Sequence, residues 1–250
     1  MKRILLTIAY DGTNYNGWQK QLSPPIPTVE GQLEKGLRKL FKDPNLTLIG
    51  ASRTDKGVHA HGQRATIDVA TTMPAEKIPM AILGFIPSDI VIVHAEEVPM
   101  TFHPRYHCVN KTYEYHILNQ KFRDPLKRLY GTFIYGDFDV EKMNEAAKKF
   151  VGKKDFKGFC TDGNEMENTV REIFRCHVER VDHEIVISVT GDGFLYHMVR
   201  TIAGTLIGVG KGKMELSRID EIFQTRDRQK AWYTAEAQAL VLKEITYDMI

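Results

Sequence analysis

The sequence lacks the features of a membrane protein, a disulfide-rich secreted protein and a thiolate metal site. Its 250 residues include only three cysteines, Cys108, Cys160 and Cys176, and no two of them form a C-x-x-C pair. An odd number of widely spaced cysteines argues against a disulfide framework and predicts a reducing, cytoplasmic environment. No apolar run reaches the roughly 18 residues that a membrane helix needs, so we expect no membrane association.

The chain also lacks a large excess of charge of either sign. Its formal net charge is +2 at pH 7, so a polyanionic partner is permitted but not required. If such a partner binds, the basic residues must be concentrated on one face of the protein. Apolar residues make up 42% and charged residues 26% of the chain, which is typical of a globular protein with a full core.

Two successive parts of the chain follow a similar order of strands and helices. The first part predicts strands at 3–10, 46–49, 63–69 and 90–95, a helix at 29–42 capped by Thr28, and a short helix opened by Pro79. The second part predicts strands at 111–118, 171–181, 184–189 and 240–247, a helix capped by Asp139 and closed by Gly152, and helices at 195–209 and 217–224. We therefore expect two α+β domains, residues 1–105 and 106–250, joined without a low-complexity linker.

The stretch Gly50–Gln63 holds the strongest candidate for chemistry. Three glycines let its backbone turn tightly: Gly50, Gly57 and Gly62. Asp55 lies between Arg53 and Lys56, and two cations beside one carboxylate favour its ionised form, as a nucleophile or base requires. The same residues also fit an ordinary Asp-Lys-Gly turn with surface charges, so the local pattern leaves both interpretations open.

The helix expected at 195–209 carries apolar residues on more than one side and should be buried nearly all round. Arg200 interrupts one of these apolar faces. A guanidinium stays charged, so a buried one needs a carboxylate or phosphate partner; alternatively, the side chain reaches solvent near the helix start. The sharper hypothesis pairs Arg200 with Asp55 across a cleft between the two domains.

Other residues permit metal or base binding. His59 and His61 lie on one side of an extended stretch, as in some metal sites, but no acidic cluster accompanies them, so we expect no metal. Tyr113 and Tyr115 share one face of a strand, which is typical of core packing, although such a ring is also able to stack on a base. The stretch 208–213 lacks the residues of a phosphate loop and is interpreted as a helix exit with a basic tip.

Five segments, taken together and in order, resemble the TruA family of tRNA pseudouridine synthases. They are Tyr10–Gln19, Arg53–Gln63, Lys111–Tyr115, Thr169–Arg171 and Phe194–Arg200. One departure is Ser52, where the family usually has glycine. The resemblance implies two RRM-like, ferredoxin-like α+β domains with mainly antiparallel sheets flanking a central active-site cleft. It also implies a homodimeric isomerase that converts uridine to pseudouridine at positions 38–40 in the anticodon stem-loop of tRNA, without cofactor or metal.

Carried over residue by residue, the resemblance makes Asp55 the catalytic aspartate and Arg200 its ion-pair partner. It makes Tyr113 the ring that stacks on the target uracil and Arg53 the residue that helps to turn the base out. Asp55 would either attack C1′ of the ribose or abstract a sugar proton to give a glycal, and both routes stay open. Two other classes fit some of the same residues: a non-catalytic RNA-binding protein, and a metal-dependent hydrolase that uses Asp55 and the two histidines.

Overall fold

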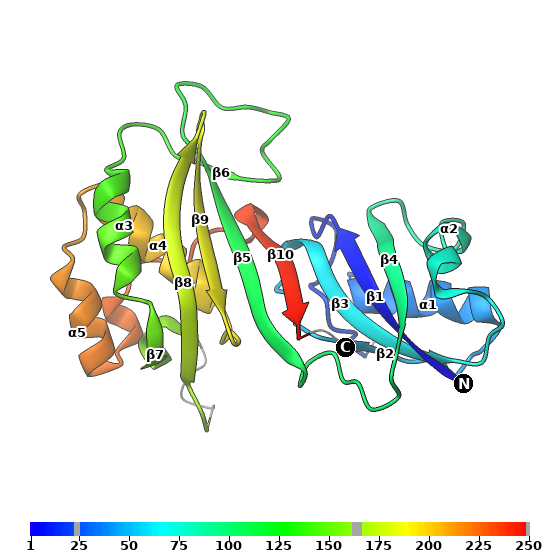
Figure 1. Ribbon diagram of the computed structural model, residues 1–250. Helices are drawn as coiled ribbons and strands as arrows, with labels where there is room; N and C mark the ends of the chain where they lie inside the picture. Colours follow the sequence, from blue (N-terminus) through cyan, green and yellow to red (C-terminus); the bar gives the residue numbers. More distant parts are fainter. Residues whose placement is uncertain (23–25, 162–166, 249–250) are drawn as a thin grey trace. The chain divides into compact units, whose positions relative to one another are not determined.

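The computed structural model describes residues 1–22, 26–161 and 167–248 (Figure 1). The chain forms two compact units: Met1–Val109 together with the chain from Val241 onward, and Asn110–Leu240. The last strand thus belongs with the first unit, because Val241 and Leu242 pair with the strand that follows Asp55. The sequence predicts two domains, 1–105 and 106–250, and this division puts the last strand in the second domain. The division into domains stays a prediction.

The first unit is built on a sheet with the strand order β4-β1-β3-β10. These strands are β1 (Lys2–Tyr10), β3 (His59–Val69), β4 (Ile90–Val98) and β10 (Leu240–Tyr247), and the short β2 (Leu48–Gly50) pairs with β3. All pairs are antiparallel except β10 with β3. The helices are α1 (Val29–Phe41), a 3₁₀ turn η1 (Ala75–Lys77) and α2 (Ile78–Ala81).

Helix α1 forms where its sequence predicts it and lies along one face of this sheet (Figure 1). The Thr28 side chain accepts a hydrogen bond from the Gly31 N–H group, as an N-cap does. Val29, Leu33 and Leu37 recur every four residues and are fully buried, so one apolar stripe joins the helix to the sheet.

The second unit has a sheet with the order β5-β9-β8-β7, and its neighbouring strands are antiparallel. Its strands are β5 (Cys108–Leu118), β6 (Thr132–Phe133), β7 (Gly152–Asp155), β8 (Val170–Val181) and β9 (Glu184–Gly191), with β6 parallel to β5. Its helices are α3 (Val140–Lys148), α4 (Met198–Gly210) and α5 (Ser217–Thr225), with 3₁₀ turns η2 (Lys157–Phe159), η3 (Arg228–Lys230) and η4 (Ala237–Ala239). The mostly antiparallel mixture confirms the α+β class. No helix in the described part of the chain could cross a membrane.

Several predicted boundaries differ from the structure, and three of them change how a residue is interpreted. Strand β3 begins at His59 and not at Gln63, so Gly62 lies inside a strand. A Cβ atom on Gly62 would lie 2.5 Å from the Lys243 carbonyl oxygen, so this glycine permits close strand contact and makes no turn. Helix α4 begins at Met198 and not at Leu195, because His197 adopts a left-handed conformation with φ 60°.

The third wrong boundary is the end of α3. The helix is capped by Asp139 as predicted, but it ends at Lys148 and does not extend to Gly152, which is the first residue of β7. The hairpin between β8 and β9 turns at Asp182 and His183 as expected. Asp182 takes a positive φ of 52° there, which Asp tolerates better than most residues.

Candidate active site

Asp55 lies in a tight turn between β2 and β3. The Val58 N–H group donates to the Asp55 carbonyl oxygen at 3.2 Å, which closes a four-residue turn. Its third residue, Gly57, has φ +79°, a conformation that side-chain-bearing residues rarely adopt. Asp55 is half-buried, whereas Arg53 and Lys56 are exposed. The backbone is therefore the Asp-Lys-Gly turn that the sequence permits, and its surroundings decide whether Asp55 has a chemical role.

The loop after β1 holds this turn by hydrogen bonds. The Trp18 N–H group donates to the Thr54 carbonyl oxygen at 3.1 Å, one residue before Asp55. The hydroxyl groups of Tyr10 and Thr54 lie 2.7 Å apart, and both residues are buried. A buried hydroxyl pair is costly to break, because each group would lose its partner without gaining water. The residue before Asp55 is thus fixed through both its backbone and its side chain.

Two glycines allow the two loops to pack backbone against backbone. A Cβ atom on Gly12 would lie 2.0 Å from the Val58 carbonyl oxygen. A Cβ atom on Gly17 would lie 2.6 Å from the Thr54 carbonyl oxygen, and Gly17 also has φ +78°. Neither distance is compatible with a side chain unless the backbone moves. The Asp55 turn is therefore held on both sides by contacts that only glycine permits.

Gln63 fixes the other end of the loop. Its side chain is fully buried; the Nε2 atom donates to the Ser52 carbonyl oxygen at 2.8 Å, and the Oε1 atom accepts from the Ser52 N–H group at 3.3 Å. Gln63 closes the motif Arg53–Gln63, but its residue type alone predicts no role. An amide side chain within a strand carries no local signal of this two-point contact, so only its place in the motif marked it.

The two histidines have different environments. His59 is buried, and its Nδ1 atom accepts a hydrogen bond from the Gly12 N–H group at 3.0 Å and lies 3.1 Å from Asp11 Oδ1. His61 is exposed. Within the described residues, no group of three or more His, Cys, Asp or Glu side chains is placed to hold a metal ion. His59 therefore joins the first loop to β3, and the hydrolase hypothesis has no ligand set in this part of the chain.

The other two predicted site residues belong to the second unit. Arg200 lies in the first turn of α4 and is the one residue of this helix that is not buried. Its Nε atom donates to the Ala235 carbonyl oxygen at 2.7 Å, and the Ala235 N–H group donates to the Arg200 carbonyl oxygen at 3.1 Å. The first bond orients the guanidinium group, and the second joins the backbone at the start of α4 to Ala235. The helix is buried nearly all round, as its pattern predicted.

Tyr113 lies on β5, and its ring packs edge-on against Phe194, with centroids 5.2 Å apart and planes at 87°. The ring is buried, with 5% of the residue exposed. Its neighbour Tyr115 is a core residue: its hydroxyl lies 2.8 Å from Thr132 Oγ1, and burial raises its pKa. Arg200 acts electrostatically on Tyr115, so the helix start and this part of β5 are close together. The structure thus brings Arg53 and Asp55 together in one loop, and Tyr113 and Arg200 into one region of the second unit.

Comparison with known proteins gives the class of this site. The family model described as "tRNA pseudouridine synthase" matches residues 6–107 and 146–248, which include three of the four predicted site residues and leave out Tyr113. The tRNA pseudouridine synthase A 2 of Clostridium tetani is 42% identical over 247 residues, covering 99% of both chains. The tRNA pseudouridine synthase A of Ruminiclostridium cellulolyticum is 44% identical over 248 residues, covering 99% of this chain and 100% of the relative.

Among solved structures, the chain is similar to "Crystal Structure of a Cbf5-Nop10-Gar1 Complex", with a TM-score of 0.38 and 12% identity over 82% of this chain and 45% of that chain. The full-length relatives and the family match define a class of isomerases that convert uridine to pseudouridine. Within that class, the chain belongs to the TruA family of tRNA pseudouridine synthases, as its motifs predicted.

Proposed function

We propose that this protein isomerises uridine to pseudouridine at positions 38–40 in the anticodon stem-loop of tRNA, in the cytoplasm and without cofactor or metal. The observation that carries the proposal is the half-buried Asp55 in a turn held by two glycine contacts, within a chain that matches family members over its full length. A turn held in this way fixes the backbone of Asp55 before substrate arrives, which favours catalysis by proximity.

The reaction exchanges one bond of the ribose for another. The N1–C1′ bond breaks, the uracil rotates, and a C5–C1′ bond forms; the base then loses its C5 proton and gains one at N1, so no oxidant or reductant is needed. The target nucleotide has to leave its stack first, because its reacting atoms are inaccessible inside a stem-loop. Asp55 acts on the ribose, either by attack on C1′ or by removal of a sugar proton to form a glycal.

The remaining site residues take roles that their chemistry allows. Arg200 is the proposed ion-pair partner of Asp55; because its Nε atom donates to Ala235, the terminal nitrogens would make this pair. Arg53 is exposed and charged, which suits a residue that helps to displace the base. Tyr113 stacks on the extruded uracil, and since its ring is buried here, RNA binding has to uncover it.

The test is to treat unmodified tRNA with purified protein and map pseudouridine by mass spectrometry. Wild-type protein should place it at positions 38–40, and Asp55→Asn should bind tRNA with similar affinity but form none, because only the ionisable oxygen is lost. Asp137→Asn, at an exposed aspartate of the second unit, makes the same chemical change elsewhere and should retain activity. Modification outside 38–40 would refute the substrate assignment, and multiple turnover by Asp55→Asn would refute the role of Asp55.

We also propose that the active form is a homodimer, which rests on the resemblance to the family. Sedimentation at micromolar concentration should show a species of roughly twice the 28.6 kDa chain mass. A single species at the chain mass, in a preparation that modifies tRNA, would show that the monomer is sufficient.

A further inference from the structure

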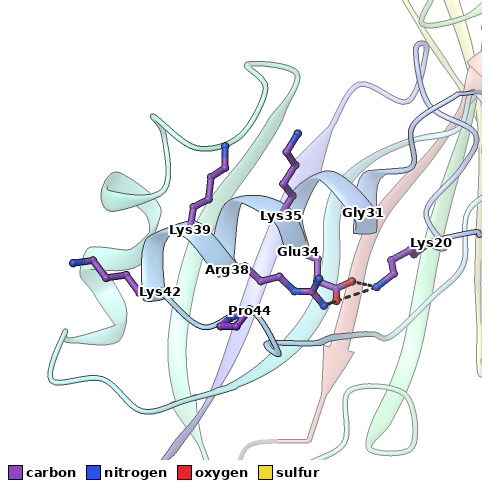
Figure 2. Close-up of a pocket in the computed structure, with 8 residues that line it drawn as sticks. All are labelled: Lys20, Gly31, Glu34, Lys35, Arg38, Lys39, Lys42 and Pro44. Atoms are coloured by element: carbon purple, nitrogen blue, oxygen red, sulfur yellow. Dashed lines mark hydrogen bonds and ion pairs between the residues drawn. The ribbon is translucent and has the colours of Figure 1, made fainter. Parts of the chain in front are cut away.

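Helix α1 carries a concentration of positive charge that the proposed catalytic chemistry does not use. A surface pocket of about 580 Å³ beside this helix is lined by five cationic side chains and one carboxylate. Its lining residues, drawn in Figure 2, are Lys20, Gly31, Glu34, Lys35, Arg38, Lys39, Lys42 and Pro44. The whole protein has a formal net charge of only +2, so this surface is far more basic than the average. It is the kind of local concentration that a polyanionic partner requires.

The single carboxylate of this surface is already neutralised. Glu34 is buried and is paired with both Lys20, at 2.8 Å, and Arg38. Figure 2 shows these three side chains joined by hydrogen bonds beside the helix. Glu34 therefore orders the two cations next to it and contributes little repulsion toward an incoming anion.

The remaining cations, Lys35, Lys39 and Lys42, are here called the α1 lysine row. All three are exposed, and no acidic group among the described residues forms an ion pair with them. Lys35 and Lys39 extend to the same side of the helix, away from the Glu34 pairs, and Lys42 extends from the helix end (Figure 2). Three long, exposed ammonium groups without acidic partners gain most from binding an anion, since no ion pair has to be broken.

The start of α1 is joined to the loop that holds the Asp55 turn. The Val29 N–H group donates to the Gly17 carbonyl oxygen at 3.2 Å, and the Glu30 N–H group to the Trp18 carbonyl oxygen at 3.0 Å. At 1.5 Å per residue, the 13 residues of α1 span about 20 Å; the α1 lysine row runs from the middle of the helix, at Lys35, to the C-cap residue Lys42 at the end farther from this loop. A ligand that reaches both the Asp55 turn and the row must therefore be an extended polyanion; a single nucleotide is too short.

We propose that the α1 lysine row binds backbone phosphates of the tRNA outside the anticodon loop that carries the target nucleotide. The inference rests on the proposed function, because it takes tRNA as the substrate. Lysine contacts to phosphate position a nucleic acid without reading its sequence, and paired RNA is recognised largely by its shape and backbone. A membrane surface fits less well, since the apolar stripe of α1 is buried against its own sheet and none of it is left to enter lipid.

The test variant is Lys35→Gln, Lys39→Gln and Lys42→Gln together. Glutamine has a helix propensity close to that of lysine at positions 35 and 39, and Lys42 is the left-handed C-cap, where both residues carry a Cβ atom; α1 should therefore keep its stability, which the thermal midpoint checks. Affinity for full-length tRNA and for an isolated anticodon stem-loop would be measured at about 50 and 200 mM salt. Three lost phosphate contacts should reduce the slope of log affinity against log salt by about 2–3. The wild-type affinity for full-length tRNA should then fall about 16- to 64-fold more over this range than that of the variant.

A matched control removes the same charge elsewhere. Lys142, Lys148 and Lys153 are exposed lysines of the second unit, and replacing all three by glutamine gives an equal change in net charge. We expect the control to keep the wild-type salt dependence, and the test variant to bind the isolated stem-loop as the wild type does.

Three results would overturn the inference: an unchanged slope in the test variant, an equal change in the control, or an equal loss on the isolated stem-loop. The first result would show that the α1 lysine row does not contact tRNA phosphates. The second would show that only the net charge of the protein matters, and the third would show that the contacted phosphates lie within the stem-loop. A wild-type protein that does not modify positions 38–40 would instead refute the proposed function, and the binding measurements would still report on the α1 lysine row.

Discussion

Replacing Gly17 by alanine tests whether the first loop positions Asp55. Alanine at φ +78° is strained by about 1–2 kcal/mol. Its Cβ atom would also lie 2.6 Å from the Thr54 carbonyl oxygen, whereas ordinary contact begins at 3.4 Å. The two backbones therefore have to separate by about 0.8 Å, the difference between these distances, directly beside Asp55. Because a shift of about 1 Å in a catalytic group costs roughly 10²-fold in rate, we expect kcat to fall by about two orders of magnitude.

The assay is single-turnover pseudouridine formation, with thermal unfolding of the same protein. The chain offers a matched control in Gly212, which has φ +64° and nothing within 4 Å of an added Cβ atom. Gly212→Ala should show the backbone strain alone, with a midpoint lower by about 2–8 °C and normal kcat. If Gly17→Ala kept normal kcat and lost no more stability than Gly212→Ala, the close contact with Thr54 would have no part in placing Asp55.

Three further predictions follow from individual contacts. Tyr10→Phe leaves the buried Thr54 hydroxyl without its 2.7 Å partner and should cost about 1–3 kcal/mol of unfolding free energy; adding Thr54→Val should restore most of it, and simple additivity in denaturant unfolding would contradict the pairing. Arg200→Met should lower both stability and turnover, since the hydrogen bond to a backbone carbonyl and the proposed ion pair are both lost, with Arg200→Lys in between; normal turnover by Arg200→Met would detach this residue from the active site. Burial raises the pKa of Cys176 to about 12, so alkylation of the native protein at neutral pH, followed by mass spectrometry, should label half-buried Cys108 well before Cys176; equal labelling would show that Cys176 is accessible.

The local sequence pattern was sufficient to predict those elements that are determined by neighbouring residues. Helix α1, with its Thr28 cap and buried stripe, and the hairpin at Asp182 follow their predicted positions closely. The error at Gly62 occurs because a distant strand intervenes. Gly62 was interpreted as a turn residue, but it lies in β3 because β10, some 180 residues later in the chain, passes directly beside it. No window of sequence around Gly62 contains that strand.

The sequence by itself determined the family and the candidate acid, because the motifs are short and the residue types at their positions are specific. It marked Asp55, and its glycine at position 57 fits the positive φ of the turn that carries this carboxylate. It also required that the basic residues gather on one face if a polyanion binds.

Only the tertiary structure decided what holds the Asp55 turn and where the positive charge gathers. Gly12 and Gly17 contact a turn about 40 residues away, and Gln63 reaches back to Ser52 through a buried amide. The α1 lysine row has a free basic surface because Glu34 is already neutralised by Lys20, from the preceding loop, and Arg38. Such contacts depend on the path of the whole chain, and residue type and local spacing do not specify that path.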